Sequence, residues 1–384
     1  MGREPIIQDN IDQPKNMKPC LLLEDLQCSN IMSIRYTAES LKTFAAKLMV
    51  KAGMDPEKTG VTAEILLEGD LMGHTTHGLQ MLIPYLKSVE AGQMQLSGSC
   101  ETIRDTGNNL VIDGHYLPGP WLVCHALDLA AERMKKHGVV TVAITRSHHI
   151  ACLQAYLPRA TSKGWMMTLM SSDPSVATVA PFGGMEALYT PNPIAVGIPT
   201  SDVPILFDFC TSITSNGQCM RSHKEGKTLP GEWIQDARGN PTSDPGELFA
   251  NPPGTIYPLG GAEYGHKGFA FGLWVEMMTA ALAGHGRSEK PDKWGASVFI
   301  QLIDPGAFGG TEAFLRESDF FAKACRDTKA VNPEQPVRLP GESAWRKRQD
   351  QLANGVQLHP GILESLEAWA EKWNIPLPSP APMS

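Results

Sequence analysis

Four of the eleven histidines occur in two tight pairs, and histidine is the side chain best suited to move protons near neutral pH. His74 and His77 lie in the segment GHTTHG, and His148 and His149 lie in TRSHHI. Residues three positions apart on a helix face the same side, so the two pairs can converge on one pocket. Imidazole groups gathered in this way favour general acid–base chemistry.

Two other interpretations of these histidines stay open. The rings can be structural, with their nitrogens satisfied at the starts of helices. They can also bind zinc in a hydrolase, together with Asp70 or Asp173. The spacing permits a metal but is not specific for one, and the acidic partner on the same helix that such sites usually have is missing. A metal site is therefore not predicted.

Several familiar motifs are absent from the chain. The GxGxxG spacing that binds dinucleotides in Rossmann domains does not occur. The run Gly226-Lys227-Thr228 is similar to the end of a P-loop, but Arg221 stands where that loop needs an upstream glycine. HExxH and GxSxG are absent too, which weakens metalloprotease and α/β-hydrolase interpretations.

The composition predicts a packed globular protein that avoids polyanions. Of 384 residues, 42% are hydrophobic and 19% are charged, and the net charge of −8 argues against nucleic-acid binding. The longest nearly apolar stretch, residues 272–284, is too short to cross a membrane, and the N-terminus does not resemble a secretory signal. The eight cysteines form no CxxC pair, so we expect reduced thiols and a cytoplasmic location.

The elements that must position the histidines can be predicted from hydrophobic periodicity. Short apolar runs predict strands at 109–112, 139–144, 166–170, 194–198, 205–209 and 298–303. Helical patterns occur at 37–53, 55–71, 79–91, 121–137, 149–163, 265–286, 311–328, 342–354 and 361–373. This alternation predicts a layered α/β fold.

The order of these elements suggests one domain inserted into another. We expect a flexible arm at 1–34 and the first part of a mainly helical domain at 35–100. The inserted domain spans 101–295 and includes a Gly- and Pro-rich irregular excursion at 221–262. Residues 296–384 complete the helical domain.

Seven segments in order resemble the malate/L-lactate dehydrogenase family, which includes ureidoglycolate, sulfolactate and diketogulonate dehydrogenases. They lie at 69–78, 145–150, 170–184, 190–199, 207–212, 236–245 and 265–278. The resemblance implies interconversion of a 2-hydroxy acid and its 2-oxo acid with NAD or NADP as cofactor. It also implies a mixed-sheet, non-Rossmann nucleotide-binding domain, and a homodimer.

The resemblance also assigns site residues. His77 and His149 match the catalytic positions, with His149 slightly ahead as the acid–base group. The cofactor contacts would come from Ser172, Asp173, Asp208, Phe209, Cys210, Lys267 and Gly268. We expect Lys267 to open the long helix, where a cation and free N–H groups together suit a diphosphate.

One position departs from the family pattern. Many members carry an arginine four residues after the first catalytic histidine, where it can pair with the substrate carboxylate, but here that residue is Met81. Arg146 is one candidate replacement, and Met81 and His74 are expected to line the substrate site. The alternatives are a larger oxo acid, a cyclic imine, or a member that binds without catalysis.

Overall fold

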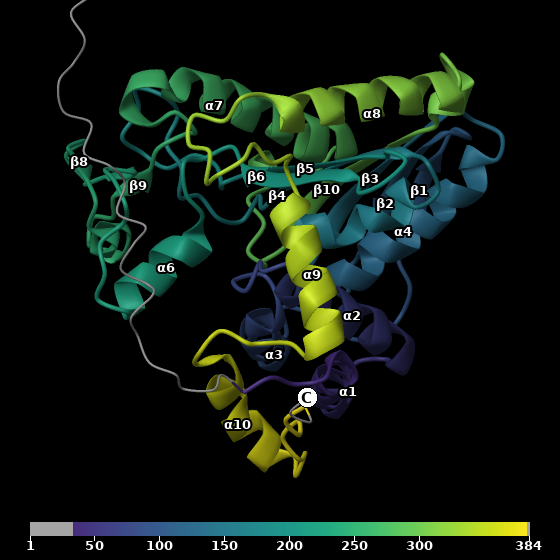
Figure 1. Cartoon of the computed structure of the whole chain (residues 1–384). Coiled ribbons are helices and arrows are strands. Elements are labelled where there is room, and N and C mark those ends of the chain that lie inside the picture. The colour runs from purple at the N-terminus through teal and green to yellow at the C-terminus, as the bar shows by residue number, and fades with distance from the viewer. Residues whose placement is uncertain (1–33, 382–384) are drawn as a thin grey trace, which may run out of the picture. The chain divides into compact units, whose positions relative to one another are not determined.

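A seven-stranded mixed sheet carries the fold in this computed structural model, which describes residues 34–381 (Figure 1). The strand order is β1-β2-β3-β10-β4-β5-β6, and only the β2–β3 pair is parallel. Its strands are β1 Glu101–Asp105, β2 Asn109–Asp113, β3 Val139–Ser147, β4 Met166–Ser172, β5 Pro193–Ile198, β6 Ile205–Cys210 and β10 Ala296–Ile303. The expectation of a mixed-sheet α/β fold is confirmed.

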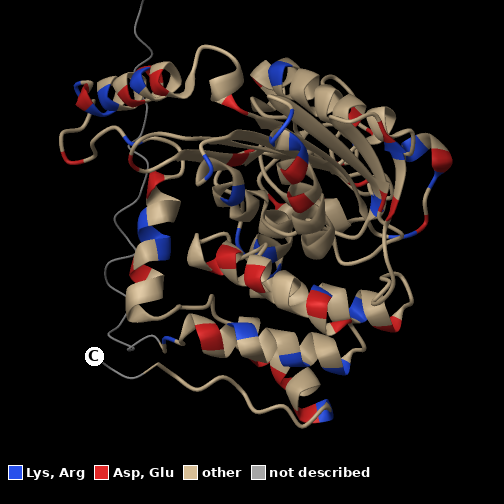
Figure 2. Ribbon diagram, turned by 90° about the vertical axis from the view of Figure 1, so that its right-hand side faces the viewer, with Lys and Arg blue, Asp and Glu red and all other residues tan. Residues whose placement is uncertain are grey.

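Helices cover both faces of this sheet. In Figure 1, α7 and α8 lie over one face, and α1 to α4 lie on the other with α9 and α10. The α-helices are α1 Ala38–Lys51, α2 Pro56–Leu71, α3 Leu82–Glu90, α4 Gly119–Met134, α5 Pro158–Thr161, α6 Asn216–Lys224, α7 Gly261–Glu276, α8 Thr311–Asp327, α9 Glu342–Asn354 and α10 Ile362–Lys372. Charged residues of both signs lie mainly on the outer helices and loops, and the strands are largely uncharged (Figure 2).

The hydrophobic core is divided by the sheet, as side-chain alternation along β10 shows. Val298 and Ile300 pack into the larger cluster, which joins the sheet to α1, α2, α3 and α4. Phe299, between them, packs with Val275 of α7 in a smaller cluster. Because successive side chains of a strand point to opposite faces, one short strand contributes to both layers.

Three expectations about the elements need correction. Residues 149–163 do not form one helix: Ala151 has a left-handed φ of 61°, and only a 3₁₀ turn, Leu153–Tyr156, and the one-turn α5 follow. Pro158 lacks the N–H that a continuous helix would need there. The excursion at 221–262 is not wholly irregular, because it holds a three-stranded sheet of β7 Ile234–Gln235, β8 Pro241–Thr242 and β9 Thr255–Ile256.

The start of the long helix is the third correction. The helix α7 begins at Gly261, so Lys267 lies in its second turn and not at its N-terminus. Gly265 and Gly268 fit inside this helix because each packs tightly, against Phe182 and against the backbone of Leu259 respectively. Tertiary packing therefore offsets the low helix propensity of these glycines.

The expected domain division stays a prediction. The boundary expected between residues 295 and 296 falls directly before β10, which pairs with β3 and β4 inside the sheet. Residues 1–33 of the expected arm lie outside the described part of the chain. Within residues 34–381, no helix is long and apolar enough to cross a membrane, and all six cysteines are free.

Candidate active site

One edge of the sheet gathers most of the residues that the sequence singles out. Ser147, at the end of β3, pairs with Ala296 at the start of β10, and the next residue, Ser297, pairs with Ser172 at the end of β4. On the far side of β4, Cys210 at the end of β6 pairs with Pro193. His148 and His149, Asp173 and the end of β6 therefore lie along the same edge.

The two predicted catalytic histidines meet at this edge. The ring centroids of His77 and His149 are 5.8 Å apart, with 27° between the ring planes. Trp294, which precedes β10, stacks on His149 at 5.1 Å, and the Tyr85 hydroxyl of α3 is 3.0 Å from His149 Nδ1. The two rings and their contacts come from four places in the fold: the loop after α2, helix α3, the loop after β3 and the loop before β10.

His149 is held as a neutral ring. The Ala151 N–H donates to Nδ1 at 3.2 Å, so Nδ1 accepts and the ring proton belongs on Nε2. Burial lowers the pKa of His149 well below its ordinary value, and the neighbouring His77 and His148 lower it further. A neutral ring with a proton on Nε2 is suited to donate a hydrogen bond to a substrate oxygen.

The surroundings of His77 suit both of its protonation states. Its Nδ1 lies 2.9 Å from the Thr76 hydroxyl, which can donate or accept a hydrogen bond. Burial lowers the pKa of His77, whereas the negative charge of Asp208 raises it. His77 can therefore gain or lose a proton and keep a partner on Nδ1 in both states.

A buried carboxyl positions the loop that carries His77. Asp70, at the end of α2, accepts a hydrogen bond from the Leu79 N–H at 2.6 Å. A side chain at Gly78 would place Cβ only 2.4 Å from this carboxyl group, so glycine is required there. Burial raises the pKa of Asp70 to about 7.

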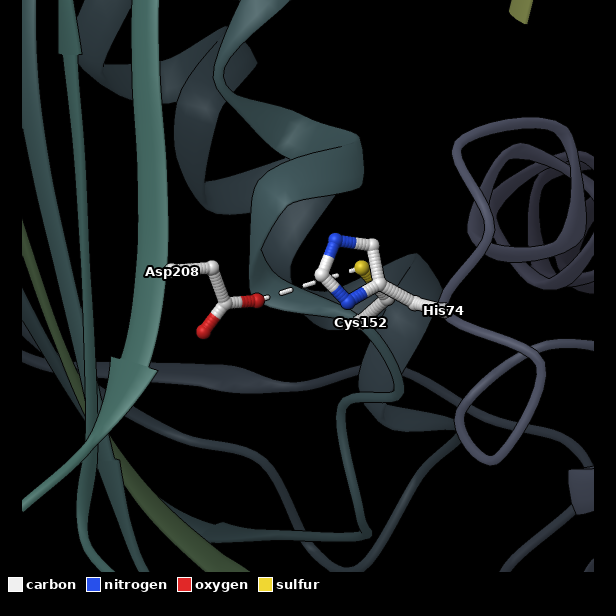
Figure 3. A group of neighbouring side chains, drawn as sticks. All are labelled: His74, Cys152 and Asp208. Atoms are coloured by element: carbon white, nitrogen blue, oxygen red, sulfur yellow. Dashed lines mark hydrogen bonds between the residues drawn. The ribbon is translucent and has the colours of Figure 1, made fainter. Parts of the chain in front are cut away.

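A second cluster lies beside the histidine pair. His74 Nε2 is 2.6 Å from Gln154 Oε1, and the Gln154 N–H donates to Asp208 at 3.0 Å. The Cys152 thiol also faces the Asp208 carboxylate, at 3.9 Å (Figure 3). This cluster opens into a pocket of about 370 Å³ lined also by Leu206 and by Gly341 and Ser343 at the start of α9.

The side chains that a metal ion could use here differ from those considered in the sequence. His74, Cys152 and Asp208 offer ligand atoms within 4.8 Å of one another. Burial and the Asp208 charge raise the pKa of Cys152 well above its ordinary value, which opposes the thiolate that a metal needs. His148 is engaged elsewhere, with Nε2 at 2.9 Å from the Ser88 hydroxyl.

The predicted cofactor residues divide between two places. Asp208 lines the pocket, and Phe209 and Cys210 follow it on β6. Gly268 packs against Leu259, whose N–H bonds to the Thr211 carbonyl just beyond Cys210. Lys267 is exposed on α7, with its Nζ 5.6 Å from the Tyr264 ring centre.

Ser172 and Asp173 are bound within the protein. The Ser172 hydroxyl lies 2.8 Å from the Thr279 hydroxyl. The Asp173 carboxylate accepts from the Ser175 N–H and hydroxyl at 2.9 and 2.7 Å. Burial nevertheless raises the pKa of Asp173 from its ordinary value.

The three residues expected at the substrate site lie in different surroundings. His74 lines the pocket, and Met81 is half-buried against the main core. Arg146 is bound to Asp113 through both Nε, at 2.9 Å, and Nη2. Its guanidinium is thus already paired with a carboxylate.

Sequence reasoning missed Tyr85, Trp294 and Gln154, which contact the histidines directly. Tyr85 could have been suspected because a buried phenol needs a hydrogen-bond partner. Gln154 was placed inside an expected helix. No local signal marks its contact with His74, which lies 80 residues away in the chain.

A buried pair of histidine rings, the side chains best suited to carry protons near neutral pH, thus lies beside a pocket at one edge of a mixed sheet. The family model described as malate/L-lactate dehydrogenase matches residues 36–367, and the chain belongs to this family. Its members are oxidoreductases that act on hydroxy acids, so a metal-dependent hydrolase is not favoured.

Relatives with different names share nearly the whole length of the chain. A malate/(S)-sulfolactate dehydrogenase from Methanothermus fervidus is 27% identical over 350 residues, which are 88% of this chain and 98% of that protein. A Δ1-pyrroline-2-carboxylate reductase from Agrobacterium fabrum is 30% identical over 88% of this chain and 96% of its own. The crystal structure of malate dehydrogenase from Entamoeba histolytica superposes with a TM-score of 0.84 at 25% identity, covering 90% and 100% of the two chains.

Proposed function

We propose that the protein uses NAD or NADP to interconvert a small 2-hydroxy acid and its 2-oxo acid. The observation that carries this proposal is the stacked pair of His77 and His149 beside a pocket that His74 and Asp208 line. Reduction of a carbonyl needs one group to deliver a proton to oxygen while carbon receives hydride. The histidine pair is suited to the first of these tasks.

The polar groups of the pocket fit a nicotinamide nucleotide. The Asp208 carboxylate can accept from a ribose hydroxyl, and the Ser343 hydroxyl and the first N–H groups of α9 can donate to a phosphate. Around the same sheet edge, Ser172, Asp173, Phe209, Cys210, Lys267 and Gly268 remain the proposed further contacts. When bound, the nicotinamide supplies or accepts the hydride at the substrate's C2.

We assign the proton to His77 and the orienting hydrogen bond to His149, which reverses the order that the sequence favoured for the acid–base group. His77 keeps its Thr76 partner whether or not it is protonated, and Asp208 stabilises its charged form. Protonation of His149 at Nδ1 would break the bond from Ala151. In the direction of reduction, His77 gives its proton to the substrate oxygen, and His149 Nε2–H holds that oxygen in place.

A cyclic-imine carboxylate is the second candidate substrate. The 30% identity with a Δ1-pyrroline-2-carboxylate reductase and the half-buried Met81 both favour it. The chemistry is the same, with hydride to carbon and a proton to nitrogen in place of oxygen. An absorbance screen of 2-oxo acids and cyclic imines, with NADH and NADPH in parallel, tests the proposal. Failure of every pair would contradict it.

A homodimer is proposed from two exposed apolar helix faces. On α7, about half of the surface of Phe271, Leu273 and Trp274 is exposed. On α8, Phe320 and Phe321 are exposed to about two thirds. Large apolar patches on a protein surface mark contacts with other proteins. Light scattering during gel filtration should give twice the mass of one chain, and Trp274→Glu should shift the protein to monomers.

A further inference from the structure

The loop that carries His77 has no cation of its own for a substrate carboxylate. Between residues 73 and 81 its sequence is GHTTHGLQM, and Met81 packs against the core. Arg146, the replacement considered from the sequence, is already paired with Asp113. A carboxylate bound beside His77 must therefore be held by a cation from another element.

Arg221 of α6 reaches this loop. Its Nη1 donates to the Thr75 hydroxyl at 3.0 Å, and its Nη2 donates to Gln80 Oε1 at 2.7 Å. Thr75 and Gln80 lie on either side of His77 in the sequence, and both are neutral. Among the residues that the structure describes, no carboxylate lies within ion-pair distance of Arg221, and the negative charges of Glu225 and Asp70 act on it only from farther away.

The packing of α6 confirms that this helix face covers the histidine. Gly217 lies one turn before Arg221, so the two residues share a face. A Cβ at Gly217 would lie 3.4 Å from Thr76 Cβ and 3.8 Å from His77 Cε1. A glycine at this point lets the helix approach, and Arg221 follows directly along the same face.

The hydrogen bonds to Thr75 and Gln80 leave some N–H donors of Arg221 unused. A guanidinium carries five N–H donors in a planar fork, and Thr75 and Gln80 each accept one of them. The remaining donors are enough for the two-point bond that arginine forms with carboxylates. The two neutral partners fix the side chain without neutralising its charge.

We propose that Arg221, oriented by Thr75 and Gln80, forms the subsite that binds the carboxylate of a 2-oxo acid or of a cyclic-imine carboxylate. This inference rests on the proposed function, and it assigns to α6 the role that the family resemblance gives to an arginine at position 81. It explains how the chain can tolerate Met81 and still hold an acidic substrate.

The subsite also links substrate binding to the proton carrier. Burial lowers the pKa of His77, the charge of Asp208 on β6 raises it, and His74 and Arg221 lower it by smaller amounts. His149 is the other titratable ring that faces His77. A bound carboxylate offsets the Arg221 charge, so His77 holds its proton more readily when the substrate is in place.

The experiment compares wild type with Arg221→Gln and Arg221→Lys, using the full chain. For pyruvate, oxaloacetate and Δ1-pyrroline-2-carboxylate, kcat/KM should fall roughly 100-fold in Arg221→Gln, mostly through KM. Arg221→Lys should recover part of this loss, and added guanidinium should partly rescue Arg221→Gln. Lys224→Ala, on the same helix and exposed, is the matched control and should behave as wild type.

Two further measurements separate the possible failures. The affinity for reduced nicotinamide should be unchanged in Arg221→Gln, which shows that the variant is folded. Oxalate, a dicarboxylate that needs no turnover, should bind to wild type at least tenfold more tightly than to Arg221→Gln in calorimetry, about 1.4 kcal/mol. If wild type turns over and binds oxalate but Arg221→Gln matches it in both assays, this subsite is wrong and the proposed function stands. If no substrate turns over, the proposed function fails. If wild type and Arg221→Gln then also bind oxalate equally, the subsite is wrong too.

Discussion

The imidazole rings of His77 and His149 lie 5.8 Å apart at one edge of the sheet, yet their hydrogen bonds prepare them for different tasks. His149 accepts a backbone N–H at Nδ1, while His77 faces a hydroxyl that can serve either protonation state. In the function that we propose, the pair divides orientation and proton transfer between two rings.

The first prediction concerns this pair. His77→Ala and His149→Ala should each lower kcat by about 10²- to 10⁴-fold, because a positioned acid or hydrogen-bond donor is lost at the reacting oxygen. Reduced nicotinamide should still bind, which fluorescence titration can measure. His137→Ala, in the turn that follows α4, is the control. Full activity in both site variants would refute the assigned mechanism.

The second prediction concerns Tyr85. Its hydroxyl donates to the His149 carbonyl at 2.9 Å and lies 3.0 Å from Nδ1, so Tyr85→Phe removes the hydrogen bond that holds the backbone of His149 in place. We expect kcat to fall about tenfold and the free energy of unfolding to fall by about 1–3 kcal/mol. Tyr264→Phe, at an exposed position on α7, should change neither quantity. Equal behaviour of the two variants would contradict this role.

The third prediction tests the glycine beside Asp70. Gly78→Ala should destabilise the protein by several kcal/mol, because Cβ would overlap the buried carboxyl group. Gly60→Ala is the control, since nothing lies within 4 Å of a Cβ at this half-buried position of α2, and a helical alanine should stabilise by about 1 kcal/mol. Denaturant unfolding measures both changes. A Gly78→Ala protein as stable as wild type would show that the loop is not held in this way.

The fourth prediction follows from the pKa of Asp70, which burial raises from 3.8 to about 7. The folded state then binds this proton more tightly than the unfolded state, so the stabilising contribution is complete below pH 4 and disappears as pH rises through 7. Relative to wild type, Asp70→Asn should gain unfolding free energy between pH 4 and 7 and level off above. Asp128→Asn, exposed on α4, should show no such trend. A difference between Asp70→Asn and wild type that is independent of pH would contradict the raised pKa.

Local sequence patterns were sufficient for most of the sheet. The strands β2 to β6 and β10 bury apolar side chains on at least one face, so hydrophobic runs predict them. All five residues of β1 are exposed, and this strand therefore has no such run. The helix expected at 149–163 failed because the left-handed Ala151 and Pro158 interrupt a favourable pattern.

Among the candidate site residues, the sequence pointed only to those that lie in motifs. His77 and His149 were found through their motifs, whereas Arg221 was noticed only as the residue that breaks a P-loop pattern. Its contact with Thr75 spans 146 positions in the chain and depends on how α6 packs. Such a contact has no local signature, because it is created by tertiary packing of an element whose own residues are mostly polar.

The central claim is that hydride reaches the C2 carbon of an oxo acid or imine at the His77–His149 pair. The most direct test is to supply nicotinamide deuterated at the transferred position and to analyse the product by mass spectrometry and NMR. Our account predicts one deuterium at C2 of the product in wild type, and about 10²- to 10⁴-fold slower formation of the same deuterated product by His77→Ala. A product without deuterium, or with deuterium at another carbon, would contradict it.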